Sequence, residues 1–370
     1  MEVTDTQLNR DVWCLLGLPI DATSEEGTLK ELCICISETR SCFLSTPNLN
    51  FLITSLDDEA FRRSVLDSDW VVADGMPLVW VGRLLGIPLP ERVPGSGVFE
   101  KLRRSGNEGK PIRVFFFGGP EGVAERACAI LSAEATPMQG VGCYYPGFGT
   151  VEDMSESSII DAINATNPDF VLVALGARKG QAWIEHNRAR LSAPVISHLG
   201  AVVNFVAGTV SRAPGWVQRT GLEWLWRIYQ EPSLFKRYWA DAVAMLKLLI
   251  INVLPLARYL RRSRRLCANA PSPRCQLSDD AGVAVIAVGG CIHNEAMGEL
   301  RDLAKQACAK GRDVALDLAE VEYIDCAFIG FLQVLESRLR RQRRHLYIRH
   351  ESPSLRRIFG LARVGYLLEQ

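Results

Sequence analysis

Short apolar runs alternate with stretches of helical spacing from about residue 12 to residue 231 of the chain. Apolar residues spaced three or four apart are typical of amphipathic helices, whereas runs of four to eight apolar residues between turn signals are typical of buried strands. The clearest strand candidates are residues 41–44, 70–73, 112–117, 170–175 and 194–198. Strands that alternate with helices indicate repeated β-α units. The pattern therefore predicts an α/β fold, with a Rossmann-like, mostly parallel sheet and helices on both faces.

Polar or glycine-rich residues follow each of these strands. They are Thr46-Pro47-Asn48, Asp74-Gly75, Gly118-Gly119-Pro120, Gly176-Ala177-Arg178-Lys179 and Gly200. In open α/β sheets, ligands bind outside the carboxyl ends of the strands. We therefore expect these five segments to line one cleft.

The character of the chain changes over residues 234–266, where apolar residues are flanked by lysines and arginines. Lys247, Asn252 and Pro255 interrupt the apolar run, which we expect to fall short of the roughly 20 residues that span a membrane. An interfacial helix with a basic end, lying on an anionic membrane surface, fits this pattern. The alternative is a helix packed on the preceding domain, with a solvated basic tail.

A second, smaller α/β domain is expected after a linker at residues 268–280 that is rich in proline and serine. The expected elements are strands at 283–288, 314–318 and 346–349 and helices at 294–310, from 326 to about 344, and after Ser352. We therefore divide the chain into three parts. The first α/β domain spans residues 12–235, the basic and apolar segment with the linker spans 236–275, and the second α/β domain spans 276–370.

Composition narrows the functional classes only slightly. The 370 residues carry no formal net charge, so nothing global predicts nucleic-acid binding. The polar N-terminus lacks the pattern of a signal peptide, and we expect a cytoplasmic protein. Eleven cysteines are scattered without Cys-x-x-Cys pairs, which favours reduced core residues over disulfides or a zinc site.

Asp74 is the strongest catalytic candidate. A carboxylate at the end of an apolar strand and before a glycine stands where a ligand would bind, and partial burial raises its pKa towards useful base strength. The alternative is that Asp74 only caps a helix that starts near Pro77.

The other candidates have weaker patterns. Gly118 and Gly119 precede a helix expected at 123–133, so their loop would suit a phosphate, but it lacks a full nucleotide-binding spacing and equally suits a plain tight turn. Basic residues near loop or helix ends would neutralise a pyrophosphate leaving group, although each alone is typical of a solvated surface. They are Arg178, Lys179, Arg212, Arg227, Lys236 and Arg237.

The acidic pair in Asp67-Ser68-Asp69 precedes a strand instead of following it, so we interpret it as a helix-end or loop pair. We predict no obligatory metal and no cofactor. A cluster of tryptophans and tyrosines between residues 216 and 239 suits a wall that faces a sugar or lipid, or ordinary core packing.

Residues 12–240 resemble the WecG/TagA/CpsF glycosyltransferase family. The matching segments are Ser45-Thr46-Pro47-Asn48, Ala73-Asp74-Gly75-Met76-Pro77, Arg92-Val93-Pro94-Gly95-Ser96, Phe117-Gly118-Gly119-Pro120, Tyr145-Pro146-Gly147-Phe148, Ala207-Gly208, Arg212-Ala213-Pro214 and Leu222-Glu223-Trp224-Leu225-Trp226-Arg227.

The resemblance implies an inverting, metal-independent transfer of a sugar from a UDP-sugar donor to an undecaprenyl-pyrophosphate-linked acceptor in the assembly of bacterial surface polysaccharides. It implies that Asp74 is the general base, with Thr46 and Asn48 beside it in the acceptor pocket. It implies that Arg227 and Arg237 supply charge to the UDP leaving group. With the candidates argued above and Gln181, the residues expected at the donor or UDP are Gly118, Gly119, Arg178, Lys179, Gln181, Arg212, Arg227 and Arg237. The C-terminal segment of the family also implies peripheral association with the inner face of the membrane.

Two positions depart from the family pattern. Gly180 stands where many members have glutamine, a role that Gln181 would take with a shift of one residue. Asn204 stands where many have aspartate. These departures indicate a different donor or acceptor sugar, or, as the alternative, an inactive scaffold that acts through the second domain.

Residues 276–370 resemble a STAS domain through the strand, Tyr323-Ile324-Asp325 and the helix that follows. Many relatives have a phosphorylated serine after that aspartate, whereas this chain has Cys326. The resemblance therefore implies partner binding or nucleotide sensing without a phospho-switch, and we expect a protein partner at this domain.

Overall fold

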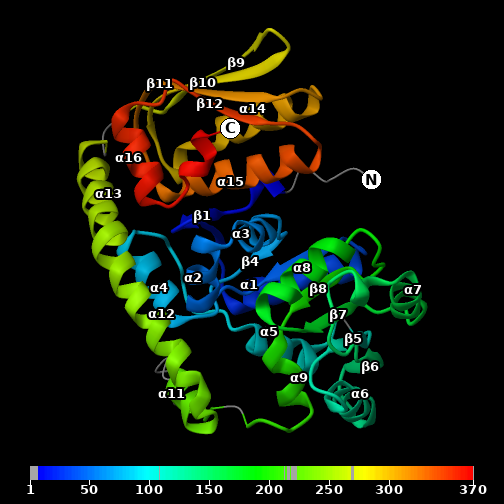
Figure 1. Cartoon of the computed structure of the whole chain (residues 1–370). Helices are drawn as coiled ribbons and strands as arrows, with labels where there is room; N and C mark the ends of the chain where they lie inside the picture. The colour runs from blue at the N-terminus through cyan, green and yellow to red at the C-terminus, as the bar shows by residue number, and fades with distance from the viewer. Residues whose placement is uncertain are drawn as a thin grey trace.

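The computed structural model describes residues 7–107, 109–211, 213–214, 217, 223–267 and 271–369. These residues form two α/β lobes, each built around its own sheet, and a long helix runs along one side of both (Figure 1). The larger sheet lies in the N-terminal lobe and the smaller sheet in the C-terminal lobe.

The larger sheet has six parallel strands in the order β4-β3-β8-β7-β5-β6. They are β3 (Cys42–Ser45), β4 (Trp70–Val71), β5 (Ile112–Gly118), β6 (Met138–Tyr144), β7 (Phe170–Ala174) and β8 (Val195–His198). All five expected strands are present, which confirms the α/β prediction. The sequence analysis missed β6, because Gly140 and Gly142 dilute its apolar run and little of the strand is buried.

Helices cover both faces of this sheet. Phe115 and Phe117 of β5 point to one face and Phe116 to the other, as the alternation of a strand requires. The helices α1 (Glu25–Ser37), α5 (Gly95–Ser105), α6 (Val123–Ala133) and α9 (Gly200–Val206) pack on one face, and α7 (Ser157–Ala165) and α8 (Ala177–Asn187) on the other. The helices α2 (Leu49–Asp57), α3 (Glu59–Leu66) and α4 (Met76–Leu84) belong to a third cluster, which the smaller lobe shares.

The smaller sheet has the order β12-β11-β10-β9, in which only β9 pairs antiparallel. Its elements are β9 (Arg274–Asp280), β10 (Val283–Ile292), α14 (Gly298–Ala309), β11 (Val314–Ile324), α15 (Cys326–Arg341), β12 (Leu346–Arg349) and α16 (Pro353–Leu361). This confirms the expected small α/β domain. The expected linker is wrong in its second half, which forms the edge strand β9.

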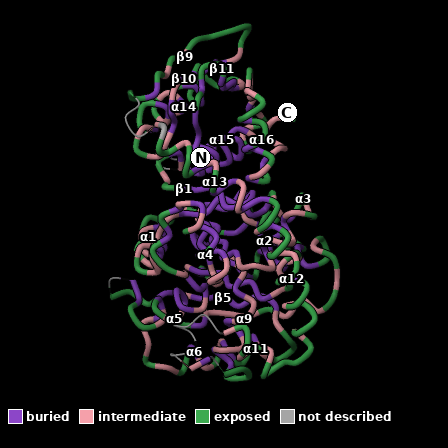
Figure 2. The backbone as a smooth tube through the Cα atoms, turned by 90° about the vertical axis from the view of Figure 1, so that its left-hand side faces the viewer, coloured by how far each residue is buried: buried purple, intermediate pink, exposed green. Residues whose placement is uncertain are grey.

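The two lobes share one hydrophobic core at α15. Every residue from Cys326 to Leu339 is buried, and buried residues continue from one lobe into the other (Figure 2). An N-terminal hairpin that the sequence analysis missed, β1 (Val12–Leu15) and β2 (Leu18–Asp21), lies against this helix. A Cβ on Gly330 would overlap the carbonyl oxygen of Val12 and lie 2.9 Å from Cα of Trp13. Gln333 Nε2 donates to the Gly17 carbonyl at 2.8 Å.

A buried ion-pair network reinforces this junction. Asp67, at the end of α3, accepts from Ser337 at 2.5 Å and from Arg340 at 2.7 Å. Asp69 binds Arg188 at 2.5 Å and Arg341 at 3.1 Å. Burial opposes ionisation of Asp69, but the two arginines hold its pKa below the ordinary value. The acidic pair is thus a loop and helix-end pair, and it binds arginines of both lobes.

The long helix begins with α11 (Glu223–Gln230) and a short turn (Pro232–Leu234). It continues as α12 (Phe235–Leu248), a π-helical segment (Leu249–Val253) and α13 (Leu254–Leu266). Neither Asn252 nor Pro255 breaks it, because the proline lies at the start of α13 and Asn252 donates to the Leu361 carbonyl at 3.0 Å. The expectation that this segment is too short to span a membrane is wrong. By length and composition, Pro232–Arg265 is sufficient, and 33 % of its most apolar stretch is buried.

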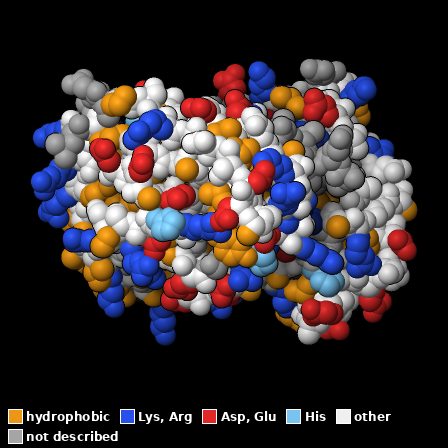
Figure 3. Space-filling model, turned by 90° about the horizontal axis from the view of Figure 1, so that it is seen from above, with side chains coloured by type: hydrophobic (Ala, Val, Ile, Leu, Met, Phe, Trp, Pro, Cys, Tyr) orange, Lys and Arg blue, Asp and Glu red, His pale blue; other side chains and the backbone are white. Residues whose placement is uncertain are grey.

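This helix has one apolar and one basic exposed surface. We define the apolar stripe as the exposed side chains of α12 and the π-helical segment that recur three or four residues apart. They are Phe235, Trp239, Val243, Leu246 and Ile250. Arginines at 258, 261, 262, 264 and 265 are exposed on α13. Seen from above, Lys and Arg side chains gather along the edge where α13 lies (Figures 1 and 3).

The cysteines correct one expectation. Cys267, after α13, and Cys291, in β10, form a disulfide. The other nine, among them Cys33, Cys35 and Cys128, form no disulfide in the described part of the chain, which accords with reduced residues. Spacing could not reveal the pair, because the two cysteines lie on different elements that meet only in the fold.

We predict that Gly330→Ala destabilises the protein, because the neighbours that an added Cβ would meet are backbone atoms of β1 that cannot rotate away. Overpacking of this kind costs about 1–3 kcal/mol. Gly360→Ala in α16 is the matched control, since a Cβ there meets nothing within 4 Å and alanine favours a helix by about 1 kcal/mol. Chemical denaturation measures both variants. Equal stabilisation by the two alanines would contradict the close approach of β1 to α15.

Candidate functional site

Asp74 lies where β4 ends, at the carboxyl edge of the larger sheet. Its backbone N–H donates to the Pro47 carbonyl at 2.8 Å, which fixes it beside the loop that follows β3. Its Oδ2 accepts a long bond from the Gly95 N–H at 3.4 Å. Gly75 is the N-cap of α4, and no side chain caps that helix. The alternative that the Asp74 carboxylate caps α4 is therefore wrong.

The surroundings of Asp74 favour a carboxyl group that gains and loses a proton near neutrality. Burial raises its pKa to about 7, although Arg92 and Arg227 oppose this shift; Glu223 adds to it. Arg92 and Glu223 form an ion pair at 2.5 Å. The carboxyl group thus has two cations near it and remains poorly solvated, which is a setting for general base catalysis.

Arg92 is a site residue that the sequence analysis did not single out. It belongs to the segment Arg92-Val93-Pro94-Gly95-Ser96, which carries the family resemblance, and that segment was the available signal. Glu223 and Arg227 come from α11, more than 130 residues later in the chain. Only the fold reveals that they meet Asp74.

Thr46 and Asn48 lie in the loop next to Asp74. A Cβ on Gly95 would lie 3.1 Å from Cγ2 of Thr46, and Thr46 is buried. Asn48 is the N-cap of α2, where its Oδ1 accepts from the Phe51 N–H at 3.1 Å. Its backbone lies beside Gly75. The structure therefore brings together Asp74 and both expected acceptor residues.

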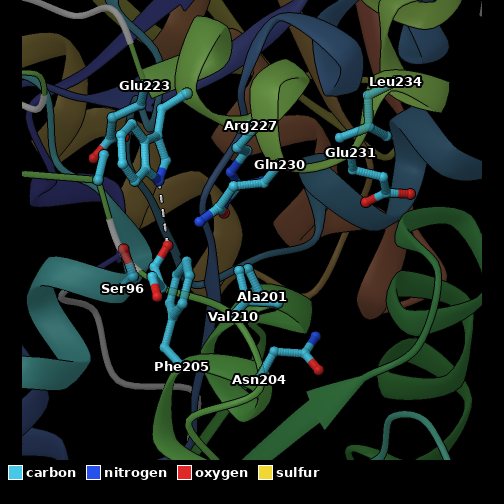
Figure 4. Close-up of a pocket in the computed structure, with 13 residues that line it drawn as sticks. Ser96, Ala201, Asn204, Phe205, Val210, Glu223, Arg227, Gln230, Glu231 and Leu234 are labelled. Carbon is cyan, nitrogen blue, oxygen red and sulfur yellow. Dashed lines mark hydrogen bonds between the residues drawn. The ribbon is translucent and has the colours of Figure 1, made fainter.

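A pocket of about 310 Å³ opens beside this group. Arg227 and Gln230 of α11 lie on one side of it, and Asn204 and Phe205 of α9 lie on the other (Figure 4). Its remaining lining residues are Ser96, Ala201, Val210, Ser211, Ala213, Glu223, Trp226, Glu231 and Leu234. Seven of these thirteen lining residues are polar or charged, and the mixture of polar, apolar and aromatic side chains suits a small polar ligand such as a sugar.

Gly118 and Gly119 form a tight turn at the end of β5, with φ of 89° and 92°. The N–H of Gly119 donates to the Ala174 carbonyl at 2.7 Å, so this amide is engaged within the protein. The helix that follows starts after Gly122 without a side-chain cap. Of the two alternatives that the sequence left open, a phosphate-binding loop and a plain tight turn, this geometry favours the tight turn.

The basic candidates are dispersed. Arg178 pairs with Asp58 at 3.2 Å, and Lys179 donates to the Gly149 carbonyl at 2.7 Å. Arg237 is exposed on α12, with its guanidinium 5.3 Å from the centre of the Tyr238 ring. None of these three lines the pocket, whereas Arg227 does. Arg212 lies outside the described residues.

Gln181 does not open on the pocket. It is buried, and its Nε2 donates to Ser45 Oγ at 2.9 Å. The neighbouring Gly180 leaves room for an imidazole, since a Cβ there would lie 3.0 Å from Cγ of His198 and would overlap Cδ2. His198 Nε2 lies 2.5 Å from the Leu175 carbonyl, and burial lowers its pKa despite that bond. The departure at Gly180 thus has a physical reason, which the sequence analysis missed.

Comparison with known proteins gives two family matches. Residues 13–259 match the glycosyl transferase WecG/TagA/CpsF family, and residues 275–369 match the Mlab, STAS domain family.

The chain is 28% identical over 202 residues to a protein of Bacillus spizizenii strain W23, covering 55% of this chain and 76% of the relative. A Bacillus subtilis strain 168 protein is 29% identical over 202 residues, with 55% and 77% covered. A Staphylococcus aureus strain MW2 protein is 22% identical over 236 residues, with 63% and 91% covered. All three are named N-acetylglucosaminyldiphosphoundecaprenol N-acetyl-beta-D-mannosaminyltransferase.

We predict that Asp74→Asn stabilises the protein increasingly as the pH rises from about 4 to about 7. The raised pKa means that the folded state binds the Asp74 proton more tightly than the unfolded state, so wild-type stability falls over this range and an amide removes the loss. Urea unfolding at several pH values measures the difference. The control is Asp153→Asn, because hydrogen bonds from Thr150 lower the pKa of Asp153, so its effect on stability should change below about pH 4 and stay nearly constant over this range. A stability difference for Asp74→Asn that is constant with pH would contradict the assignment.

Proposed function

The chain belongs to the WecG/TagA/CpsF glycosyltransferase family, and from this premise we propose that it transfers a sugar from a UDP-sugar to an undecaprenyl-pyrophosphate-linked saccharide. The transfer inverts the anomeric centre, needs no metal, and serves bacterial surface-polysaccharide synthesis. The curated relatives are named for transfer of N-acetylmannosamine to N-acetylglucosaminyldiphosphoundecaprenol, which supports a lipid-linked acceptor. The observation that carries the proposal is the poorly solvated Asp74 carboxyl group, on which both Arg92 and Arg227 act electrostatically.

Asp74 acts as the general base in this proposal. As the acceptor hydroxyl oxygen bonds to the anomeric carbon, its proton passes to Asp74 and the bond from that carbon to the UDP oxygen breaks. A pKa of about 7 leaves the carboxylate ionised in a large fraction of molecules at neutral pH and basic enough to accept the proton. Base and leaving group lie on opposite faces of the sugar, so the configuration inverts.

Arg227 stabilises the diphosphate charge that develops on UDP. It lies at the wall of the pocket and acts on Asp74 through space, so it can reach both the base and the leaving group. A guanidinium can bind a phosphate through two parallel hydrogen bonds. In this proposal the diphosphate lies beside Arg227 and the sugar ring of the donor lies beside Glu231, whose carboxylate disfavours the diphosphate and accepts hydrogen bonds from hydroxyl groups.

The apolar stripe supplies a membrane contact close to the site. Trp239 is 64% and Ile250 58% exposed, and both lie on the helix that continues from α11. The exposed arginines of α13 extend this surface with positive charge suited to anionic lipid. Leu248, Val253 and Leu256 on the same helix are buried in the core that both lobes share. These contacts favour peripheral association with the inner membrane face over a helix that crosses the bilayer.

We expect Asp74→Asn to lower turnover by roughly 100-fold or more, because an amide cannot accept the acceptor proton. UDP release is measured over a panel of UDP-sugars with a short-chain lipid-pyrophosphate-sugar acceptor. Asp153→Asn, an exposed carboxylate outside the site, is the matched control and should retain turnover. Near-normal turnover of Asp74→Asn would remove this residue from the mechanism. If wild-type protein binds UDP but transfers no sugar, the scaffold alternative gains.

Membrane association is tested by flotation with anionic liposomes. Replacing both Trp239 and Ile250 by lysine should greatly reduce flotation, because two exposed apolar contacts become charges that resist burial in lipid. Phe148→Lys is the control, since Phe148 is 99% exposed in a loop outside the long helix. Flotation of the double variant equal to that of wild type would sink the proposed contact surface.

A further inference from the structure

The helix that STAS relatives place after their phosphorylation site is enclosed in this chain. All residues of α15 from Cys326 to Leu339 are buried. Three parts of the N-terminal lobe contact this helix: the N-terminal hairpin, α3 and the turn at residues 7–9. Asp325 caps α15 through the Phe328 N–H at 2.9 Å and is itself buried. Cys326 is buried, and the nearby Cys14 of β1 contributes, after burial, to raising its pKa. The N-terminal lobe therefore already covers the surface of α15.

The same domain also anchors the far end of the long helix. The Cys267–Cys291 disulfide joins the residue after α13 to β10. Asn252 in the π-helical segment donates to the carbonyl of Leu361, the last residue of α16. The rings of Tyr259 and Tyr323 lie 6.1 Å apart, between α13 and β11. Three separate contacts thus connect this helix to the C-terminal domain.

The near end of the helix carries the residues that face Asp74. Glu223 and Arg227 lie on α11, which has no buried residue among those described. A core of its own therefore does not hold α11 in place. Its contacts include the Arg92–Glu223 pair, a hydrogen bond from Trp226 Nε1 to the Ser211 carbonyl at 3.4 Å, and its continuation into α12, where Asp241 accepts from Asn50 at 3.3 Å. The position of Arg227 consequently depends on the position of the helix as a whole.

We infer that the partner of the STAS domain is the chain's own N-terminal lobe, and that this domain holds the long helix so that Arg227 stays close to Asp74. The inference rests on the proposed function, because it assigns to Arg227 the diphosphate of the donor. The C-terminal domain then acts as a positioning module for the donor side of the site. Its effect reaches the reaction through helix position, without a phosphorylated residue.

The test measures UDP affinity by calorimetry in the full-length chain. Asn252→Ala combined with Cys267→Ser removes two of the three contacts and should weaken UDP binding roughly fivefold or more, the usual range of coupling between distant sites. Arg274→Ala is the control, since Arg274 pairs with Glu320 on the surface of the same domain and should leave UDP affinity unchanged. Circular dichroism verifies folding, and if the double variant does not fold, Cys267→Ser alone provides the same test.

Combination with Arg227→Ala distinguishes positioning from general destabilisation. If the STAS domain acts through Arg227, the interface variant should weaken UDP binding no further in the Arg227→Ala background. Equal UDP affinity of wild type and interface variant, or additive losses in the combined variant, would overturn the inference. Absence of UDP binding by wild type would instead overturn the proposed function, so the two failures are distinguishable.

Discussion

The structure depends on the packing of α15 against the N-terminal hairpin. At Gly330 the helix and β1 approach so closely that a methyl group would overlap backbone atoms. Asp67 and Asp69 fasten the same junction by binding Arg340 and Arg341. The two carboxylates are nearly buried, and removing an arginine would leave a poorly solvated negative charge with fewer partners. The first strand and the last domain of the chain are therefore parts of one core.

This junction has consequences at the opposite end of the molecule. The parallel sheet presents Thr46, Asn48 and Asp74 at its carboxyl edge, but the cations that suit a diphosphate leaving group are not all on the sheet. Arg227 arrives on α11, at the start of a helix that ends on the C-terminal domain. In the mechanism that we propose, the site is thus assembled from one element that the sheet positions and one that the second lobe positions. The same helix exposes the apolar stripe, so the proposed lipid contact and the proposed donor contact share one element.

Much of the fold follows from local patterns, and what does not follow is mostly long-range. The apolar runs of β5 and β7 are buried on both faces, so composition alone reveals them. Asp74 could be identified because it follows a strand, and ligands bind at the carboxyl ends of the strands in such sheets. In contrast, β1 and β2 are short, and their turn depends on Leu16 and Gly17 with positive φ.

The pocket joins α9 to α11, and no spacing in the sequence indicates that these helices meet. Arg340 and Arg341 follow an amphipathic pattern that suits a solvated surface equally well, and only the fold places carboxylates against them. Gly180 departs from the family pattern, and the structure explains the glycine, because the His198 ring fills the space that a side chain there would need. The contacts that form the pocket and the junction between the lobes join residues far apart in the chain, so local sequence patterns do not reveal them.

The most direct measurement of the central claim is the anomeric configuration of the product. Nuclear magnetic resonance of the glycosylated lipid acceptor gives the configuration at the newly linked carbon, and the nucleotide-sugar donor provides the reference. A single displacement with Asp74 as base predicts inversion relative to the donor. Retention would require a covalent intermediate or front-face attack, and it would contradict the account of Asp74 as the base that activates the acceptor.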